Sequence, residues 1–408
     1  MLITKLYILL IVIVIFAATT TTTTKMTSQL DTGSLDFALA VSRELVNQDS
    51  ARNLVFSPFS LSTALTMTLM GSRGRTGEEL SRVLLGKSYT ADGYKSLANE
   101  YHSLVDRVLK ANSGILLSAN YLYAHKSYPI RKDYRQMIEQ SFAGKARDVD
   151  FEGQPQSAVK TINSDVSDAT KGKIKTLFDD IDSATKLILV NALYFKGLWK
   201  TPFKTKDTKP RKFTTARNDI LDVPTMHQKV KVPFMVHDDL NLSAIELTYD
   251  KSNCAMLILL PNTGVTLESM IGKLTAETLS QIVGSLTPQK LDIYLPKFKL
   301  ESILPLIPTL THLGIQDIFN SEVADFSAMT SDPMGLYVGE VLQKAVIEVN
   351  EEGTEAAAAT SVAMMARSMD FPESFEANRP FMFLLVSKYE PKKSTLLFAG
   401  IVNNPLTA

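Results

Sequence analysis

Residues 353–360 read Gly353-Thr354-Glu355-Ala356-Ala357-Ala358-Ala359-Thr360, and the pair Arg367-Ser368 follows a short distance downstream. Alanine runs usually favour helix. This one instead lies between two apolar segments that are typical of strands, 345–349 on one side and 381–386 on the other. A surface helix or a plain linker would explain the alanines but not their place between strands. We therefore interpret the stretch as a movable strand.

The side chains that follow Gly353 suit insertion as a strand, in which successive residues point to opposite faces of a sheet. Glu355 is the one charged residue before Arg367, so we expect its face to meet solvent. Small residues at the leading positions would enter an opening sheet without obstruction. The two sets are Thr354, Ala356, Ala358, Thr360, Val362 and Met364, against Glu355, Ala357, Ala359, Ser361, Ala363 and Met365.

The composition is that of an ordinary globular protein, with 408 residues of which 45% are hydrophobic and 21% charged. This length is sufficient to bury a large core. No Pro-rich, Gly/Ser-rich or strongly charged linker divides the sequence after its N-terminus, so we expect one large domain over 35–408. The formal net charge of zero indicates no particular partner and gives no sign of nucleic-acid binding.

The N-terminus has the order of a secretory signal, with Lys5, an apolar run from Leu6 to Ala18 and then small residues. We expect residues 1–18 to be removed and the protein to be secreted without a membrane attachment. The run is short for a membrane span, which needs about 20 apolar residues, and an uncleaved signal anchor is the alternative. Residues 19–34 are rich in threonine and are expected to form a flexible segment, either a spacer or an O-glycosylated tether.

Two local features fit a secreted domain that is held together by its core. Cys254 is the single cysteine, so no intrachain disulfide is available, and its apolar run over 253–260 predicts a buried strand residue. A catalytic or intermolecular role for the thiol is the alternative. The sequon Asn241-Leu242-Ser243 is a candidate glycosylation site on a surface loop.

Apolar periodicity predicts helices mainly in the first half of the chain and strands mainly in the second, without an internal repeat. Ser57 and Pro58 precede an apolar run and mark the start of a helix. The predicted helices are 35–46, 61–70, 76–85, 94–109, 134–142 and 156–170. The predicted strands are 114–124, 187–195, 253–260, 345–349 and 381–386.

The sequence offers no catalytic constellation. None of its histidines has a metal-ligand spacing such as H-E-x-x-H. Two glycine patterns, over 71–77 and 81–88, lack the spacing of a dinucleotide or phosphate loop, and no G-x-S-x-G nucleophile elbow occurs. We therefore expect neither a metal site nor an enzyme. The histidines are His102, His125, His227, His237 and His312.

Several long segments resemble the serpin family, from about Leu35 to Pro405. Residues 53–60, Asn-Leu-Val-Phe-Ser-Pro-Phe-Ser, are similar to the family's early N-x-x-x-S-P-x-S segment. Residues 189–199 are similar to its central N-x-x-Y-F-K-G-x-W strand. Further similar segments are 313–319, 324–327 and 397–405. Together with 353–360, these matches cover nearly the whole chain beyond its N-terminus.

The resemblance implies an α+β fold with a large central, mostly antiparallel β-sheet, two smaller sheets, about nine helices and an exposed reactive loop at about 353–380. It also implies a metastable native state. In this family a protease cleaves the loop, and the freed strand inserts into the main sheet and carries the covalent acyl-enzyme with it. The chain is therefore expected to be a serine protease inhibitor, consumed as it works, and not an enzyme.

The family pattern implies that the attacked bond lies fourteen residues beyond the hinge Gly353, which gives Arg367 and Ser368. A guanidinium there suits a protease pocket with a carboxylate at its base, because the two groups form a charge-assisted, bidentate contact. The expected partner is a trypsin-like serine protease, held in a covalent complex. An assignment shifted to Met365, with elastase-like or chymotrypsin-like targets, is the alternative, because the downstream segment varies in length within the family.

The resemblance also carries over a polar cluster where the central strands part. Ser57, Ser60 and Asn191 match this cluster, and Gln343 stands where a histidine is common. Glutamine keeps hydrogen-bonding capacity but does not titrate near neutral pH, which puts one hydrogen bond of that region in doubt. The positions that match the insertion point are Trp199, Lys297 and Glu351.

Seven basic residues stand against one acid between 196 and 212, and some serpins use basic surfaces to bind heparin-like glycosaminoglycans. This patch is the candidate site for such a cofactor, and a solvated basic edge is the alternative. The helix expected near 94–111 mixes bases with acids and is not expected to bind a polyanion. The patch consists of Lys196, Lys200, Lys204, Lys206, Lys209, Arg211 and Lys212.

Two other functions stay open: a non-inhibitory serpin that acts as a carrier or chaperone, and a hydrolase on another fold. The hinge argues against the first, because 353–360 contains no bulky residue or proline and one charge, Glu355. The second would need a nucleophile and a base that the sequence does not offer. We expect a monomer, with loop exchange into polymers as a hazard on heating.

Overall fold

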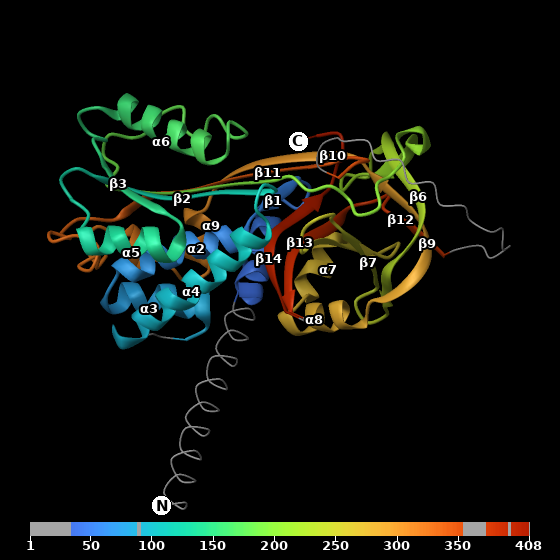
Figure 1. The fold of residues 1–408 in the computed structure, drawn as a ribbon, viewed down its shortest axis with the longest axis horizontal. Helices are drawn as coiled ribbons and strands as arrows, with labels where there is room; N and C mark the ends of the chain where they lie inside the picture. The colour runs from blue at the N-terminus through green and yellow to red at the C-terminus, as the bar shows by residue number, and fades with distance from the viewer. Residues whose placement is uncertain (1–33, 88–90, 354–372, 391–392, 408) are drawn as a thin grey trace, which may run out of the picture.

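The computed structural model describes residues 34–87, 91–353, 373–390 and 393–407. These residues form helices and two β-sheets around a large apolar core (Figure 1). A first helix is described over 34–48. The other α-helices are α2 (Pro58–Gly71), α3 (Gly74–Leu85), α4 (Ala91–Ala111), α5 (Lys132–Phe142), α6 (Pro155–Ala169), α7 (Leu267–Lys273), α8 (Ala276–Ser285) and α9 (Ile307–His312).

Strands supply most of the regular structure in the second half of the chain. They are β1 (Leu54–Phe56), β2 (Leu116–His125), β3 (Lys145–Val149), β4 (Leu187–Phe195), β5 (Lys209–Thr214), β6 (Ile220–His237), β7 (Leu242–Thr248), β8 (Cys254–Pro261), β9 (Thr287–Pro296), β10 (Phe298–Pro305), β11 (Val338–Val349), β12 (Glu373–Glu376), β13 (Phe381–Glu390) and β14 (Lys393–Val402). The six helices and five strands predicted from the sequence are all confirmed.

Helix α2 shows why the early Ser-Pro segment folds as it does. The Ser57 side chain caps the helix by accepting a hydrogen bond from the Ser60 amide at 3.1 Å, and Pro58 occupies the first turn, where its missing N–H costs nothing. All fourteen residues of α2 are buried. A helix without a polar face must lie inside the molecule, so α2 becomes the central support of both sheets.

The five-stranded sheet has the order β10-β11-β4-β2-β3. Strands β10 and β11 are antiparallel, and so are β4 and β2, whereas the central pair β11 and β4 and the outer pair β2 and β3 are parallel. Helix α6 lies on one face of this sheet, and α2 to α5 lie on the other (Figure 1). The seam between β4 and β11 is thus covered on both sides.

The remaining strands form a nine-stranded sheet in which every pairing is antiparallel except that of β12 with β9. The fold class is confirmed, with two differences in its sheets. The five-stranded sheet is mixed and not mostly antiparallel, since two of its four pairings are parallel. The strands expected as two smaller sheets are hydrogen-bonded into one, because the 18-residue strand β6 pairs with β7 at one end and with β5 and β9 along the rest of its length. Among the described residues, no helix has the length and apolar character needed to cross a membrane.

Candidate functional site

The seam between β4 and β11 is the feature around which the predicted site residues gather. The two strands are hydrogen-bonded directly, in parallel, from the pair Val338 and Leu187 to the pair Ile347 and Phe195. Adjacent strands lie about 4.8 Å apart, so no further strand fits between them in this state. A strand inserted here from the end of β11 would run antiparallel to both neighbours, which is favourable hydrogen-bonding geometry.

Gly353 lies at the head of this seam and is held in a conformation that requires glycine. Its φ is +118°, and it bridges to Leu198 beyond the end of β4 and to Asn350 beyond the end of β11. A Cβ at this position would approach the Gly197 carbonyl oxygen to 2.3 Å and the Trp199 amide nitrogen to 2.6 Å. Backbone atoms cannot yield to such a contact. The residues Thr354, Glu355, Ala356, Ala357, Ala358, Ala359 and Thr360, and the bond between Arg367 and Ser368, lie outside the described residues.

Trp199 lies at the head of the seam, where it contacts the turn at 350–353. Its amide donates to the Glu352 carbonyl at 2.9 Å, and its indole Nε1 donates to the Asn350 carbonyl at 3.0 Å. The indole also stacks on Tyr249 with ring centroids 4.4 Å apart. The turn at 350–353 is therefore joined to the segment that follows β4, and this junction has to separate before a strand can enter.

The structure brings Lys297 and Glu351 together beside the same turn, with Nζ and Oε2 2.9 Å apart. The Glu351 side chain is 7% exposed, and its other oxygen accepts a hydrogen bond from Thr208 Oγ1 at 2.8 Å. Burial raises the pKa of Glu351 and is the largest single effect, but the hydrogen bonds from Lys297, Thr208 and the backbone, with the charge of Lys297, together lower it by more, so the pKa lies below its ordinary value. The ionised pair stabilises the native turn.

This shift predicts an acid-sensitive contribution to stability from Glu351. Because the pKa is depressed in the native state, the contribution is present above the ordinary value of 4.5 and is lost as the pH falls through the lower native value. The Glu351→Gln variant should therefore unfold at a lower temperature than the parent at pH 7, and this difference should narrow below pH 4.5. Thermal unfolding across pH measures it. A constant difference, or an equal effect in the neighbouring Glu352→Gln control, would contradict the assignment.

The residues predicted to form a polar cluster lie together at the seam, and all are buried. Gln343 and Asn191 are direct partners across the seam, and the Gln343 amide nitrogen donates to the Asn191 side-chain oxygen. Gln343 also accepts from the Ser57 amide at 2.7 Å and donates to the Ser57 carbonyl at 3.1 Å. Gln343 thus makes three hydrogen bonds within the cluster.

Asn120 belongs to this cluster and was missed by the sequence analysis. It lies in β2 directly opposite Asn191, accepts a hydrogen bond from Ser60 Oγ at 2.8 Å, and also accepts one from Asn191. A buried asparagine within an otherwise apolar strand was the available signal. The cluster thus divides into two parts, Ser57 with Gln343 and Ser60 with Asn120 and Asn191, joined across the seam by the bond between Gln343 and Asn191.

Replacing Gln343 by leucine should weaken the seam specifically. The change leaves the Ser57 amide and the Asn191 side chain without their partner, and each buried unpaired group costs about 1–3 kcal/mol. We expect a lower unfolding temperature and faster uptake of an added peptide with the sequence of residues 354–367.

The matched control for this prediction is Asn112→Leu. Asn112 is also buried and donates to the Val108 carbonyl and to Ser387 Oγ, and neither partner belongs to β4 or β11. The control should lower the unfolding temperature without changing the rate of peptide uptake. Equal uptake by both variants would show that general destabilisation, and not the seam contact, governs opening.

The basic patch is divided in two by its contacts. Arg211 pairs with Glu376 at 3.2 Å and Lys212 with Asp222 at 2.8 Å, and Lys196 is half-buried. Arg211 and Lys212 therefore have acidic partners within the chain, and Lys196 is less exposed than the other four. The exposed members, clustered around the start of β5, are Lys200, Lys204, Lys206 and Lys209.

The two remaining candidates from the sequence, Asn241 and Cys254, lie at an exposed turn and in a buried strand. Asn241 is exposed in the turn between β6 and β7, with φ +49°. Cys254 is buried at the start of β8, as predicted; its thiol lies 2.9 Å from Asn112 Oδ1, and burial raises its pKa to about 12. Within the described residues, no group of three histidine, cysteine or carboxylate side chains could hold a metal ion.

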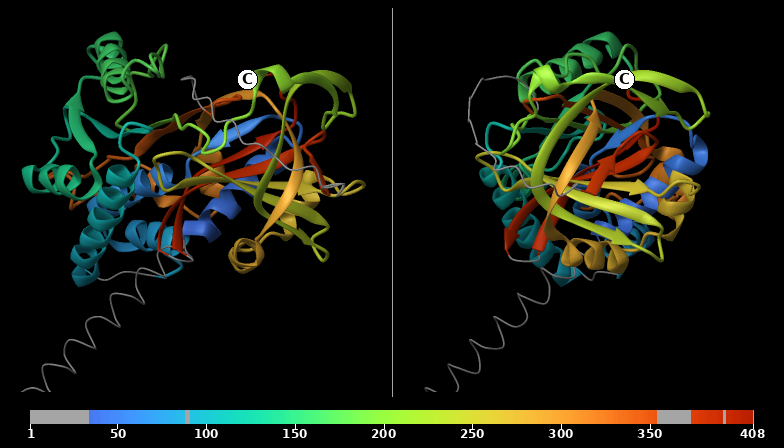
Figure 2. Two further views of the ribbon diagram at one scale, coloured as in Figure 1. Left: turned by 45° about the vertical axis from the view of Figure 1, so that its right-hand side comes forward. Right: turned by 90° about the vertical axis from the view of Figure 1, so that its right-hand side faces the viewer.

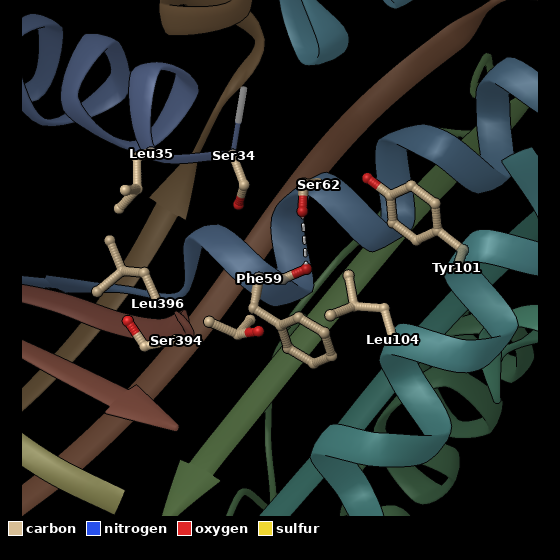
Figure 3. Close-up of a pocket in the computed structure, with 9 residues that line it drawn as sticks. Ser34, Leu35, Phe59, Ser62, Tyr101, Leu104, Ser394 and Leu396 are labelled. Atoms are coloured by element: carbon tan, nitrogen blue, oxygen red, sulfur yellow. Dashed lines mark hydrogen bonds between the residues drawn. The ribbon is translucent and has the colours of Figure 1, made fainter. Parts of the chain in front are cut away.

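A small cavity between the first helix, α2, α4 and β14 offers no alternative active site (Figure 3). Its volume is about 10 Å³, which is room for about one water molecule. The buried Thr395 hydroxyl, which lacks a partner, would suit such a water. Other lining residues include Phe59, Leu104 and Ser62, whose hydroxyl donates to the Phe59 carbonyl at 3.0 Å. The lining contains no nucleophile with an adjacent base.

Comparisons with known proteins agree with this geometry. The sequence model described as serpin (serine protease inhibitor) matches residues 32–405, and the chain belongs to that family of inhibitors, which are not enzymes. The leukocyte elastase inhibitor of Equus caballus is 34% identical over 386 residues, covering 92% of this chain and all of that protein. The leukocyte elastase inhibitor of Xenopus tropicalis is 36% identical over 385 residues, covering 92% and 99%.

Solved structures of serpins superimpose on nearly the whole chain. Native protease nexin-1 with heparin superimposes with a TM-score of 0.81 at 31% identity, covering 93% of this chain and 100% of that one. Thyroxine-binding globulin in complex with thyroxine gives a TM-score of 0.80 at 28% identity, covering 93% and 99%.

Proposed function

We propose that this serpin is a secreted inhibitor of trypsin-like serine proteases that acts as a suicide substrate. One arrangement carries the proposal. The seam between β4 and β11 is closed, Gly353 stands at its head, and a run of small residues follows that leads to Arg367. The chain therefore has a place for an added strand, a hinge beside that place, and a strand of suitable composition next in sequence.

The proposed reaction begins as ordinary proteolysis. The protease serine attacks the Arg367 carbonyl, the bond to Ser368 breaks, and the new amino group of Ser368 leaves, so that Arg367 is held as an ester. Water would complete hydrolysis. The residues from Thr354 to Arg367 are no longer joined to Ser368. They instead enter the seam and pair with both β4 and β11. The ester is trapped if insertion is faster than hydrolysis.

Opening the seam has a cost that insertion must offset. The direct ladder between β4 and β11 breaks, together with the contact of Gln343 with Asn191 and the junction at Trp199. The inserted strand replaces one ladder by two. Since each backbone hydrogen bond contributes about 1 kcal/mol net, the exchange favours insertion over the length of the strand.

Arg367 is the basis for the trypsin-like assignment. An apolar protease pocket would have to desolvate a guanidinium without a partner, whereas a carboxylate at the pocket base pairs with it. Two relatives are named leukocyte elastase inhibitors. Their names support the alternative, in which an elastase-like or chymotrypsin-like protease cleaves the bond after Met365. Identification of the cleaved bond separates the two.

The proposal of secretion rests on the signal-like order of residues 1–18, followed by the Thr-rich segment 19–34. Exposure of Asn241 in a turn supports its use as a glycosylation site in a secreted protein. The exposed lysines 200, 204, 206 and 209 are a candidate site for a heparin-like polyanion, and protease nexin-1, a relative, has been solved with heparin.

Incubation with trypsin tests the proposal. We expect a complex that survives denaturing electrophoresis and a released C-terminal peptide that begins at Ser368. The Arg367→Ala variant should lose most of its rate with trypsin, by two orders of magnitude or roughly 3 kcal/mol in transition-state stabilisation, while keeping its fold.

Two results would contradict the proposal. Cleavage without a stable complex would place the protein with carriers, in the way that thyroxine-binding globulin binds thyroxine. A peptide beginning at Ala366, with a complex formed by elastase, would move the attacked bond to Met365. The Lys160→Ala variant, a change on the exposed face of α6, is the control and should behave as the parent does.

A further inference from the structure

Three exposed lysines share one face of the strand pair β6 and β9, because their positions alternate in register along the two strands. The strand pair itself comes toward the viewer in the right-hand view of Figure 2. Lys229 and Lys231 belong to β6, and Lys290 belongs to β9. Lys231 and Lys290 are exposed, and the Lys229 side chain is 58% exposed. We call these three residues the lysine face. It is separate from the basic patch between 196 and 212.

Lys231 and Lys290 are direct partners in the antiparallel ladder. Residues opposite each other in such a ladder have Cβ atoms about 5 Å apart on the same face, and like charges there are destabilising. Neither lysine has an acidic partner among the described residues. The pair is therefore a local defect of the isolated protein, which a negatively charged partner would relieve.

Neighbouring charges on the same face are, by contrast, paired within the chain. Asp292 contacts His227 and lies 3.5 Å from Lys229. Arg211 pairs with Glu376 at 3.2 Å and covers the Tyr294 ring at 3.8 Å. The charges near Asp292 and Tyr294 are thus paired with opposite charges. The positive charges of Lys231 and Lys290, nearer the start of β9, are not paired within the described part of the chain, and we call this part of the lysine face its uncompensated end.

The uncompensated end lies where the reactive segment rejoins the fold. Strand β12 runs parallel to β9, and its first residue, Glu373, pairs with Leu291, the neighbour of Lys290. Arg367 is six residues before Glu373, a distance that an extended chain spans in at most about 20 Å. A protease is several times wider than that, so one that holds Arg367 in its pocket has its surface within reach of the lysine face.

We propose that Lys231 and Lys290, with Lys229 beside them, form a docking surface for an acidic patch on the target protease. The inference rests on the proposed function and adds to it a property of the partner: a negatively charged surface next to its trypsin-like pocket. Its effect is on encounter, because complementary charge mainly raises association rates. A protease is favoured over a polyanion because the face is a compact group of three cations beside carboxylates, at the exit of the reactive segment.

Two trypsins of opposite net charge, one anionic and one cationic, are the probes. We measure the second-order rate constant for the loss of intact inhibitor. Both products, the covalent complex and the cleaved chain, count toward this loss, so the rate reports docking even if the acyl-enzyme is not trapped. The Lys231→Gln/Lys290→Gln variant should lose roughly tenfold in rate with anionic trypsin at low salt. The loss should vanish near 1 M salt, where charges more than about 3 Å apart are screened.

The stoichiometry of trapping should not change, which separates docking from the insertion step. The matched control is Lys160→Gln/Lys273→Gln, which removes two exposed lysines from α6 and α7 and should leave the rate unaltered. An equal rate for parent and variant with both trypsins would overturn the proposal. So would a loss that appears only when heparin is added, because that result assigns the face to a polyanion.

Discussion

The direct hydrogen bonding of β4 to β11 is the constraint on which the rest of this structure depends. While these two strands pair with each other, the five-stranded sheet is complete and has no room for another strand. The residues and helices around the seam all contact the sheet in this closed state. Trp199 and Gly353 close its head, the contact of Gln343 with Asn191 holds its middle, and α2 and α6 cover its two faces. Each of these contacts stabilises the closed sheet and has to change when the sheet opens.

The proposed activity divides into two physical tasks that different residues perform. Trapping depends on the seam, the hinge at Gly353 and the small side chains that follow it. Recognition depends on Arg367 and, in our inference, on the lysine face beside β12. The two tasks are nearly independent, since one concerns backbone pairing inside the molecule and the other concerns charge at its surface. This separation explains how relatives named for elastase inhibition can share the fold while this chain has arginine at the expected bond.

Much of the fold was predictable because strong local signals agree with the final structure. The capped start of α2 at Ser57 and Pro58 and the apolar run at Cys254 are examples. The family segments also pointed to Trp199, Lys297 and Glu351, which lie beside the turn at 350–353. Other features depend on strand register, which sequence does not reveal. Asn120 joins the polar cluster because it lies opposite Asn191, and Lys231 lies opposite Lys290 for the same kind of reason. The union of the outer strands into one sheet depends on the length of β6.

We expect cleavage of the reactive segment to convert the protein into a more stable form with an added strand. Thermal unfolding before and after cleavage within 354–372, with both pieces retained, tests this claim most directly. The cleaved protein should unfold at a higher temperature, because the inserted strand is hydrogen-bonded to both β4 and β11, which pair directly with each other in the intact sheet. An unchanged or lower unfolding temperature after cleavage would contradict the account.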